Sequence, residues 1–191
     1  MNRMLAASAV FLLALATPAT SAVRHNRIAP SAIGSLRLGM DRQAAKKALR
    51  QIRAGTLRSV QDTHVAGGST YLEYSYYRGY GIDSYTLGFL GPRGKPRALR
   101  VARIVTFVPA DRTARGAHVG TSLAALDRMY GSAMHCGPTI EVGRGTGYMP
   151  CRVGAASKRH IVLLLSKNDV SGWTVGRVIV QVPGLKIPIV Q

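Results

Sequence analysis

The residues best suited to recognition chemistry in this chain are aromatic and lie in one short stretch. That stretch contains Tyr71, Tyr74, Tyr76, Tyr77, Arg78 and Tyr80. Tyrosine and arginine are enriched where protein surfaces recognise partners, because each offers broad contact area and a polar end. We take these six as candidate partner-binding residues. The alternative is that they are ordinary strand residues, half packed under a helix with their hydroxyls in water.

The acidic residues and histidines do not form a recognisable catalytic set. The acidic residues are Asp41, Asp62, Glu73, Asp83, Asp111, Asp127, Glu141 and Asp169, and no close pair indicates glycosidase chemistry. The histidines are scattered, although His135 beside Cys136 leaves a metal or thiol site open. The glycine-rich residues 143–147 lack the Gly-Lys-Ser/Thr ending of a phosphate loop, and no Gly-x-Ser-x-Gly occurs. The sequence therefore predicts no enzyme, no cofactor and no metal site.

Cys136 and Cys151 are the only two cysteines. An exported chain meets an oxidising compartment, where two such residues most often form a disulfide. The bond would close a loop of about 15 residues and contribute about 3 kcal/mol in the chain-entropy model. A metal site is the weaker reading, because the spacing is not Cys-x-x-Cys.

The first residues have the pattern of a signal peptide. Arg3 gives a positive start, residues 5–15 are apolar, and Thr20 and Ala22 are the small residues before a cleavage site. The apolar run is shorter than the about 20 residues that span a bilayer. We expect residues 1–22 to be removed near Ala22 and the protein to be secreted, either extracellular or periplasmic. A buried N-terminal helix is the alternative.

The chain is strongly basic, with a net charge of +18, or +17 without Arg3. Such a charge attracts anionic partners: phospholipid headgroups, wall polymers, nucleic acid or an acidic protein. The basic residues are dispersed, so they could also serve only to solvate the surface. Nucleic acid is disfavoured by the export signal and by the absence of a recognised module. The rest of the chain has no membrane-spanning segment, so we do not expect an integral membrane protein.

Two similar sequence motifs begin the helices that we expect to position the candidate residues. Leu38-Gly39-Met40-Asp41 and Val119-Gly120-Thr121-Ser122 each place a glycine and a helix cap before an amphipathic segment. The predicted buried residues are Ala45, Ala48, Leu49 and Ile52 in the first helix, and Leu123, Leu126, Met129 and Tyr130 in the second. The ends match as well, since residues 103–109 parallel residues 177–183. The pattern indicates an internal repeat.

Alternating residues predict strands at 71–77, near 85–89 and at 99–108, then near 148–153, 160–166 and 173–182. In the first strand the alternation predicts Tyr74 and Tyr76 on one face and Tyr71 and Tyr77 on the other. We therefore expect an α+β fold of two units, each with one or two short helices and a roughly three-stranded antiparallel meander, the helices on one sheet face. The units span residues 32–110 and 111–184. We predict that residues 23–31 form a flexible N-terminus and that residues 185–191 form a C-terminal tail. A second short helix near 57–61 is a weaker expectation.

The glycine motif, the following helix and the strand meander resemble the beta-lactamase-inhibitor-protein-like fold, and are similar to the small lipoprotein of the outer-membrane assembly machinery. Leu38-Gly39-Met40-Asp41 is the closer copy of the motif. Secreted bacterial proteins with two such units and a cysteine pair in the second half look like this chain over nearly its mature length. The resemblance implies a sheet that binds protein instead of a catalytic centre. This chain differs from the small lipoprotein in having two units and no lipidated cysteine.

The sequence as a whole favours an exported, non-catalytic binding module that contacts a protein partner through its sheet. The alternative is electrostatic adhesion to an anionic envelope polymer or membrane surface.

Overall fold

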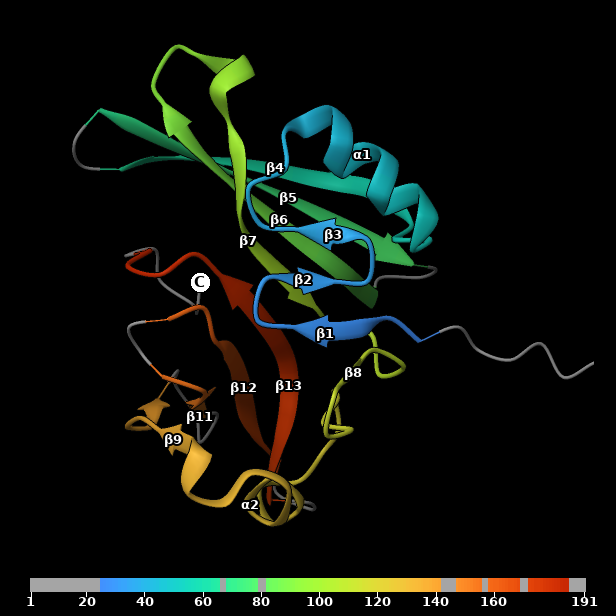
Figure 1. Ribbon diagram of the computed structural model, residues 1–191, viewed down its shortest axis with the longest axis vertical. Coiled ribbons are helices and arrows are strands. Elements are labelled where there is room, and N and C mark those ends of the chain that lie inside the picture. The colour runs from blue at the N-terminus through green and yellow to red at the C-terminus, as the bar shows by residue number, and fades with distance from the viewer. Residues whose placement is uncertain are drawn as a thin grey trace, which may run out of the picture.

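The computed structural model describes residues 25–65, 68–78, 82–141, 147–155, 158–168 and 172–185. Over these ranges the chain forms two β-sheets, two α-helices and two short 3-10 helices (Figure 1). The fold is therefore α+β and mostly sheet. The predicted signal peptide and residues 186–191 of the predicted tail lie outside the described residues.

A nine-stranded antiparallel sheet forms the body of the molecule. Its order is β10-β11-β12-β13-β7-β6-β5-β4, and β9 also pairs with β11. The strands are β4 (Thr56–Val65), β5 (Ser69–Arg78), β6 (Ile82–Pro92), β7 (Arg100–Thr106), β9 (Met134–Cys136), β10 (Ile140–Glu141), β11 (Gly147–Val153), β12 (Ile161–Asn168) and β13 (Gly172–Gln181). The two meanders become one sheet because β7 pairs with β13, with Val105 opposite Ile179.

Helix α1 (Arg42–Gln51) and helix α2 (Leu123–Tyr130) begin at the predicted caps. Asp41 Oδ1 accepts a first-turn backbone N–H at 2.8 Å, and Ser122 Oγ accepts one at 3.3 Å. Each bond satisfies an amide that has no partner inside the helix. The small residues Ala45 and Ala48 let α1 pack closely on the sheet, and both are buried. The predicted helices and their caps are confirmed.

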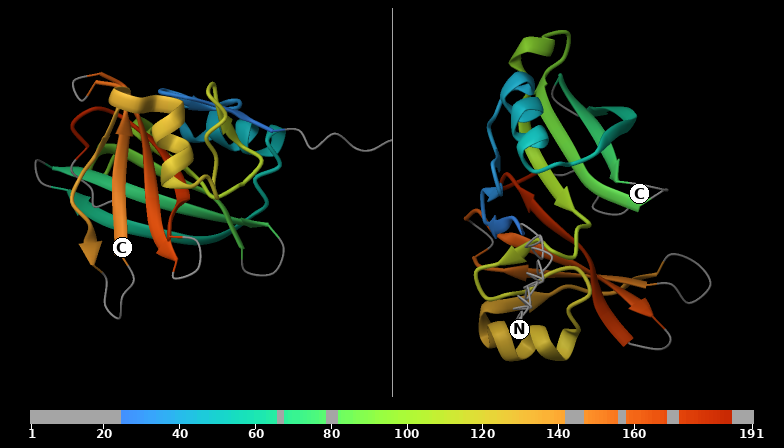
Figure 2. Two further views of the ribbon diagram at one scale, coloured as in Figure 1. Left: turned by 90° about the horizontal axis from the view of Figure 1, so that it is seen from below. Right: turned by 90° about the vertical axis from the view of Figure 1, so that its right-hand side faces the viewer.

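Both helices lie on the same side of the nine-stranded sheet (Figure 2). Their buried residues belong to one apolar cluster with the facing side chains of the strands, including Leu87, Ile104, Leu163 and Val178. A smaller cluster on β7, β12 and β13 contains Val105, Val162, Leu164 and Ile179. The arrangement agrees with the prediction that the helices share one sheet face.

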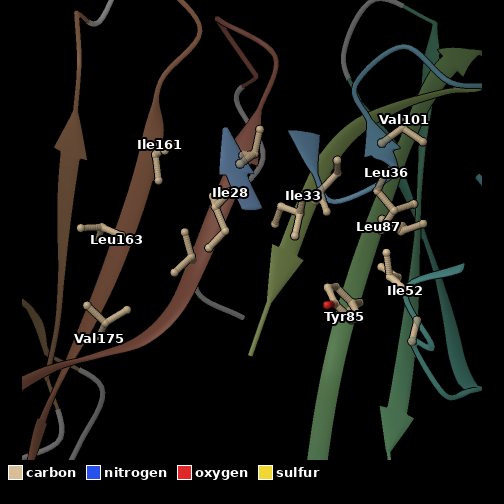
Figure 3. Packing of buried hydrophobic residues seen from close by; sticks show 14 of the residues in the cluster. Ile28, Ile33, Leu36, Ile52, Tyr85, Leu87, Val101, Ile161, Leu163 and Val175 are labelled. Carbon is tan, nitrogen blue, oxygen red and sulfur yellow. The ribbon is translucent and has the colours of Figure 1, made fainter. Parts of the chain in front are cut away.

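A second, four-stranded sheet covers the junction between the meanders. Its order is β3-β2-β1-β8, with β1 (Arg27–Ala29), β2 (Ala32–Ile33), β3 (Leu36–Arg37) and β8 (Arg112–Thr113). Figure 3 shows Ile28, Ile33 and Leu36 of this sheet between core residues of the two halves. We expected residues 23–31 to be flexible. The structure instead pairs β1 with β2 and, in parallel, with β8, because Ile28 finds a buried site there.

The first meander has one more strand than the sequence predicted. Residues 56–65 form β4, paired along its length with β5, so the helix considered near 57–61 is wrong. The sequence of β4 did not predict a strand, because its register with β5 shifts between Leu57 and Ser59. Such a bulge interrupts the regular alternation of side chains between the two faces of the sheet. The strands expected at 71–77, 99–108, 148–153, 160–166 and 173–182 agree closely with β5, β7, β11, β12 and β13.

The same backbone contact precedes each helix. The N–H of Gly39 donates to the carbonyl of Val101 (2.8 Å), and the N–H of Val101 donates to the carbonyl of Met40 (2.8 Å). In the same way, the N–H of Gly120 donates to the carbonyl of Val175 (2.7 Å), and the N–H of Val175 donates to the carbonyl of Thr121 (2.9 Å). Gly39 has φ 88° and Gly120 has φ 95°, a conformation that glycine adopts without steric cost. Each glycine thus anchors its helix to a strand of the large sheet.

One buried carboxylate ties the small sheet to the large one. Asp111 Oδ2 accepts hydrogen bonds from Tyr85 Oη (2.5 Å) and Thr106 Oγ1 (2.7 Å). Its Oδ1 accepts from the backbone N and the Nδ2 of Asn26 (3.2 and 2.9 Å). Asp111 is only 1% exposed. Because Asn26 immediately precedes β1, this network fixes the N-terminal strand to β6 and β7.

Candidate binding groove beside helix α1

An open groove of about 960 Å³ lies between α1, strands β4 to β6 and the 3-10 helix Pro96–Ala98. Six cationic residues line it: Arg42, Lys46, Arg50, Arg53, Arg97 and Arg100. Among the described residues that line it, Asp41 is the only acid, and it already accepts the helix-capping hydrogen bond. Clustered like charges in a concave site raise the local concentration of oppositely charged ligands. The groove is therefore suited to an anionic ligand.

Helical spacing places three of these cations along one side of the groove. Arg42, Lys46 and Arg50 are four residues apart, so they project from the same side of α1. All three are exposed. Arg97 lies in the 3-10 helix before β7 and Arg100 is the first residue of β7. Arg100 Nη1 donates to the carbonyls of Arg97 and Leu99 (2.9 and 3.0 Å). The positive charge therefore comes from two separate segments.

The floor of the groove is apolar and aromatic. Leu49, Leu57, Tyr74, Tyr76 and Phe89 contribute to its lining. The rings of Tyr74 and Phe89 meet edge to face with centroids 5.3 Å apart, a favourable aromatic geometry. The guanidinium of Arg42 lies 5.3 Å from the centre of the Tyr74 ring. A ligand with both negative charges and apolar groups would match this arrangement.

Arg53, at the end of α1, has an unusual backbone conformation. Its φ is 53°, and among the described residues it is the only one other than glycine with a positive φ. Glycine is the usual residue at such a position after a helix, and a left-handed residue with a side chain costs roughly 1 to 2 kcal/mol. A cation is therefore kept in the groove lining at a conformational cost.

The structure separates the six candidate residues. Tyr74 and Tyr76 face α1 and line the groove. Tyr71 and Tyr77 lie on the opposite face, as the alternation predicted, and the Arg58 guanidinium stacks over Tyr77 at 4.4 Å. The side chain of Arg78 and the whole of Tyr80 lie outside the described residues.

Tyr71 is not an accessible contact residue. It is 1% exposed, and its hydroxyl donates to Glu73 Oε2 at 2.9 Å. The Arg103 guanidinium lies 5.8 Å from its ring centre, and Arg103 Nε donates to Gln181 Oε1 at 3.1 Å. Tyr71 thus belongs to a buried polar cluster on the sheet face away from the helices. The expectation that Tyr71 contacts a partner is therefore corrected, because its side chain is buried.

Cys136 and Cys151 form the predicted disulfide. The two residues face each other in the antiparallel register of β9 and β11. Cys151 is fully buried while Cys136 is exposed, so the bond joins a short outer strand to the core. His135 is exposed next to it.

The described residues contain no group of three or more histidine, cysteine, aspartate or glutamate side chains able to hold a metal ion. In the same parts of the chain, no helix is long and apolar enough to span a membrane.

Comparison with known proteins identifies a structural neighbour. The crystal structure of the uncharacterized protein yfeY from Escherichia coli matches with a TM-score of 0.52 and 14% sequence identity. The match covers 83% of this chain and all of the other. At this identity the likeness establishes a shared fold. Models of known protein families give no match, and neither do curated protein sequences.

The groove cations are the part of the site that sequence reasoning did not assemble. The spacing of Arg42, Lys46 and Arg50 was a usable signal, since it predicts one basic helix side. Arg97 and Arg100 gave no such signal. They reach the groove only because the turn before β7 folds back beside α1.

Buried tyrosines predict a loss of stability at high pH. Burial raises the pKa of Tyr71 and of Tyr85 above the ordinary value of 10.0, and the Asp111 carboxylate adds to the effect at Tyr85. Above about pH 10 these phenols ionise in the unfolded chain but stay neutral in the folded one. The unfolded state then binds fewer protons, so the free energy of unfolding falls as pH rises.

Urea denaturation at about pH 8, about pH 9.5 and about pH 11 measures this dependence. Tyr71→Phe should reduce the slope, because it removes one of the phenols whose pKa is raised by burial. A free energy of unfolding that does not decrease across this range would contradict the prediction.

Proposed function

We propose that this protein is an exported binding module that uses the groove beside α1 to hold an acidic protein partner, without catalysing a reaction. The observation that carries the proposal is the set of six cations around an aromatic floor, with a single acid that is already engaged as a helix cap. The disulfide is compatible with an oxidising compartment. Export itself rests on the signal-peptide pattern of residues 1–22.

A protein partner fits the groove better than a purely polyanionic polymer. Phosphate or carboxylate polymers need cations only, whereas the groove also has the partly exposed apolar side chains of Leu57 and Tyr76 beside a buried aromatic floor. Aromatic side chains beside arginines are typical of the anchoring centres of protein interfaces. Adhesion to an anionic membrane or wall polymer is the competing function, and it predicts binding that depends on charge alone.

We infer further that the chain consists of two equivalent units, residues 32–110 and 111–184, of the beta-lactamase-inhibitor-protein-like kind. Support comes from the matched glycine contacts at Gly39 and Gly120, from the two capped helices and from the edge-to-edge pairing of β7 with β13. The fold shared with yfeY is in keeping with this inference. In such a plan the groove belongs to the first unit and the disulfide to the second.

The proposal is tested by charge reversal in the groove. A labelled acidic peptide with the length of β4, 10 residues, repeats Val-Val-Glu-Glu, so that each face of the extended peptide carries both valine and glutamate. It is titrated by fluorescence anisotropy. Lys46→Glu with Arg50→Glu should weaken binding by about tenfold or more, because two attractive charges become repulsive. Binding should also weaken between about 50 mM and about 300 mM salt.

The matched control is Arg128→Glu with Arg159→Glu. Both residues are exposed, and Arg128 lies in the last turn of α2 as Arg50 does in α1. The control makes the same change in net charge and should bind the peptide as the unmodified protein does. Equal weakening by both pairs would show attraction to the overall charge, and stronger capture by phosphatidylglycerol vesicles than by the peptide would favour membrane adhesion.

A further inference from the structure

Strand β4 leaves one edge of the large sheet unpaired over the described residues. It is 10 residues long and pairs with β5 only, and it stands at the end of the strand order. From Ser59 to Val65 its register with β5 is regular. Such an edge presents unpaired backbone N–H and C=O groups to any extended segment that approaches it.

The side chains of this edge strand leave an apolar strip beside the groove. Leu57 is 50% exposed and Val60 is 51% exposed. Leu57 lies opposite Tyr76 and Val60 lies opposite Tyr74 in the antiparallel register. Directly opposed residues point to the same face of a sheet, so this strip continues the aromatic floor of the groove. Helix α1 does not extend over it, since both side chains stay half exposed.

Charge decides between the possible occupants of this edge. A second copy of the chain would bring a net charge of +17 without Arg3 against the same charge, and like charges at close range disfavour association. The cations of α1 lie next to the strip. An extended segment whose α1-facing residues, which are every second residue, are apolar and acidic in turn would satisfy both features. Its apolar residues would cover Leu57 and Val60, and its acids would meet Lys46 and Arg50.

We infer that β4 accepts an acidic, extended segment of the partner protein as an additional strand of the large sheet. The inference rests on the proposed function and specifies how the partner is held. Strand addition gives affinity through main-chain hydrogen bonds and selectivity through alternate side chains. The added strand would extend the sheet outward beyond β4 and place its side chains along the open side of the groove.

Backbone methylation tests strand addition directly. In an extended strand, the N–H groups of alternate residues point to opposite edges. Two versions of the valine–glutamate peptide are made, one N-methylated at the odd-numbered residues and one at the even-numbered residues. One version should lose at least tenfold in affinity, and the other should bind within about threefold of the parent. Equal effects in the two versions would overturn the inference.

Two further measurements locate the binding edge. Hydrogen exchange should show added protection at alternate amides of β4 when the parent peptide is bound. Leu57→Ser with Val60→Ser should weaken binding by about tenfold. Ile140→Ser is the matched control, because Ile140 is 43% exposed on β10, toward the other end of the sheet. Protection confined to other strands, or equal weakening by Ile140→Ser, would count against β4.

These experiments separate the two proposals. Binding that is lost with Lys46→Glu and Arg50→Glu but affected equally by both methylated sets would keep the groove as an acid-binding site and reject strand addition. No binding of the parent peptide at low salt would reject both.

Discussion

Replacing Asp111 with alanine is expected to lower the free energy of unfolding by about 3 kcal/mol or more, measured by urea denaturation. The carboxylate accepts four hydrogen bonds, from Tyr85, Thr106 and two groups of Asn26. Hydrogen bonds to charged groups are among the stronger ones in proteins, and donors left without an acceptor in a buried site keep their full desolvation cost. The substitution also removes the hydrogen bonds from Asn26 to Asp111 that help to hold β1 on the large sheet.

Two variants make this result interpretable. Asp127→Ala removes a carboxylate from the exposed side of α2 and should change stability by less than about 0.5 kcal/mol. Asp111→Asn keeps an acceptor of nearly the same shape without the charge, so it should fall between the alanine variant and the unmodified protein. If Asp111→Ala costs no more than Asp127→Ala, the network does not stabilise the fold in the way its geometry implies.

Gly88→Ala is expected to be the second strongly destabilising substitution, by about 2 to 3 kcal/mol. The Tyr71 side chain crosses Gly88, so an added Cβ would lie 2.0 Å from its hydroxyl oxygen and 2.4 Å from Cζ. Atoms cannot approach that closely, and the ring is held by Glu73 and packed beside Arg103. Relief would require moving a side chain that is almost completely buried.

The control for this substitution is Gly176→Ala on β13. A Cβ there would lie 3.1 Å from Ser166 Oγ, a small side-chain atom that can rotate away, so a loss below about 1 kcal/mol is expected. A double-mutant cycle gives a second readout. When Tyr71→Val is already present, Gly88→Ala should cost much less than it does alone, because the clashing ring is gone. Additive losses would show that the ring is not the cause.

Local signals predicted the parts of the fold that depend on neighbours in sequence. Asp41 and Ser122 precede apolar residues at helical spacing, and their capping bonds form as expected. The tyrosine alternation in β5 correctly assigned Tyr74 and Tyr76 to one face. The disulfide could be predicted because the chain has only two cysteines. In each case the physical cause acts within a few residues or admits only one pairing.

Long-range features were not predictable in the same way. The partner of Asp111 is Asn26, 85 residues away, and no local pattern marks either residue. The strands of the small sheet have two or three residues, too few to show alternation. Tyr71 and Tyr74 are both tyrosines on the same strand, β5. Their surroundings differ because of distant parts of the chain. On one face of the sheet Gly88 leaves room for the Tyr71 ring, which is buried in a polar cluster. On the other face α1 packs near Tyr74, which lines the groove.

The seam between β7 and β13 has a symmetry of its own. Val105 pairs with Ile179, and on either side Ile104 pairs with Val180 and Thr106 with Val178. Residues 103–109 parallel residues 177–183 in sequence, so exchanging the two segments maps this ladder onto itself about its central pair. Twofold pairing of this kind usually joins separate, identical subunits, whose association depends on concentration. Here both strands belong to one chain, so they pair within a single molecule, and this pairing does not depend on protein concentration.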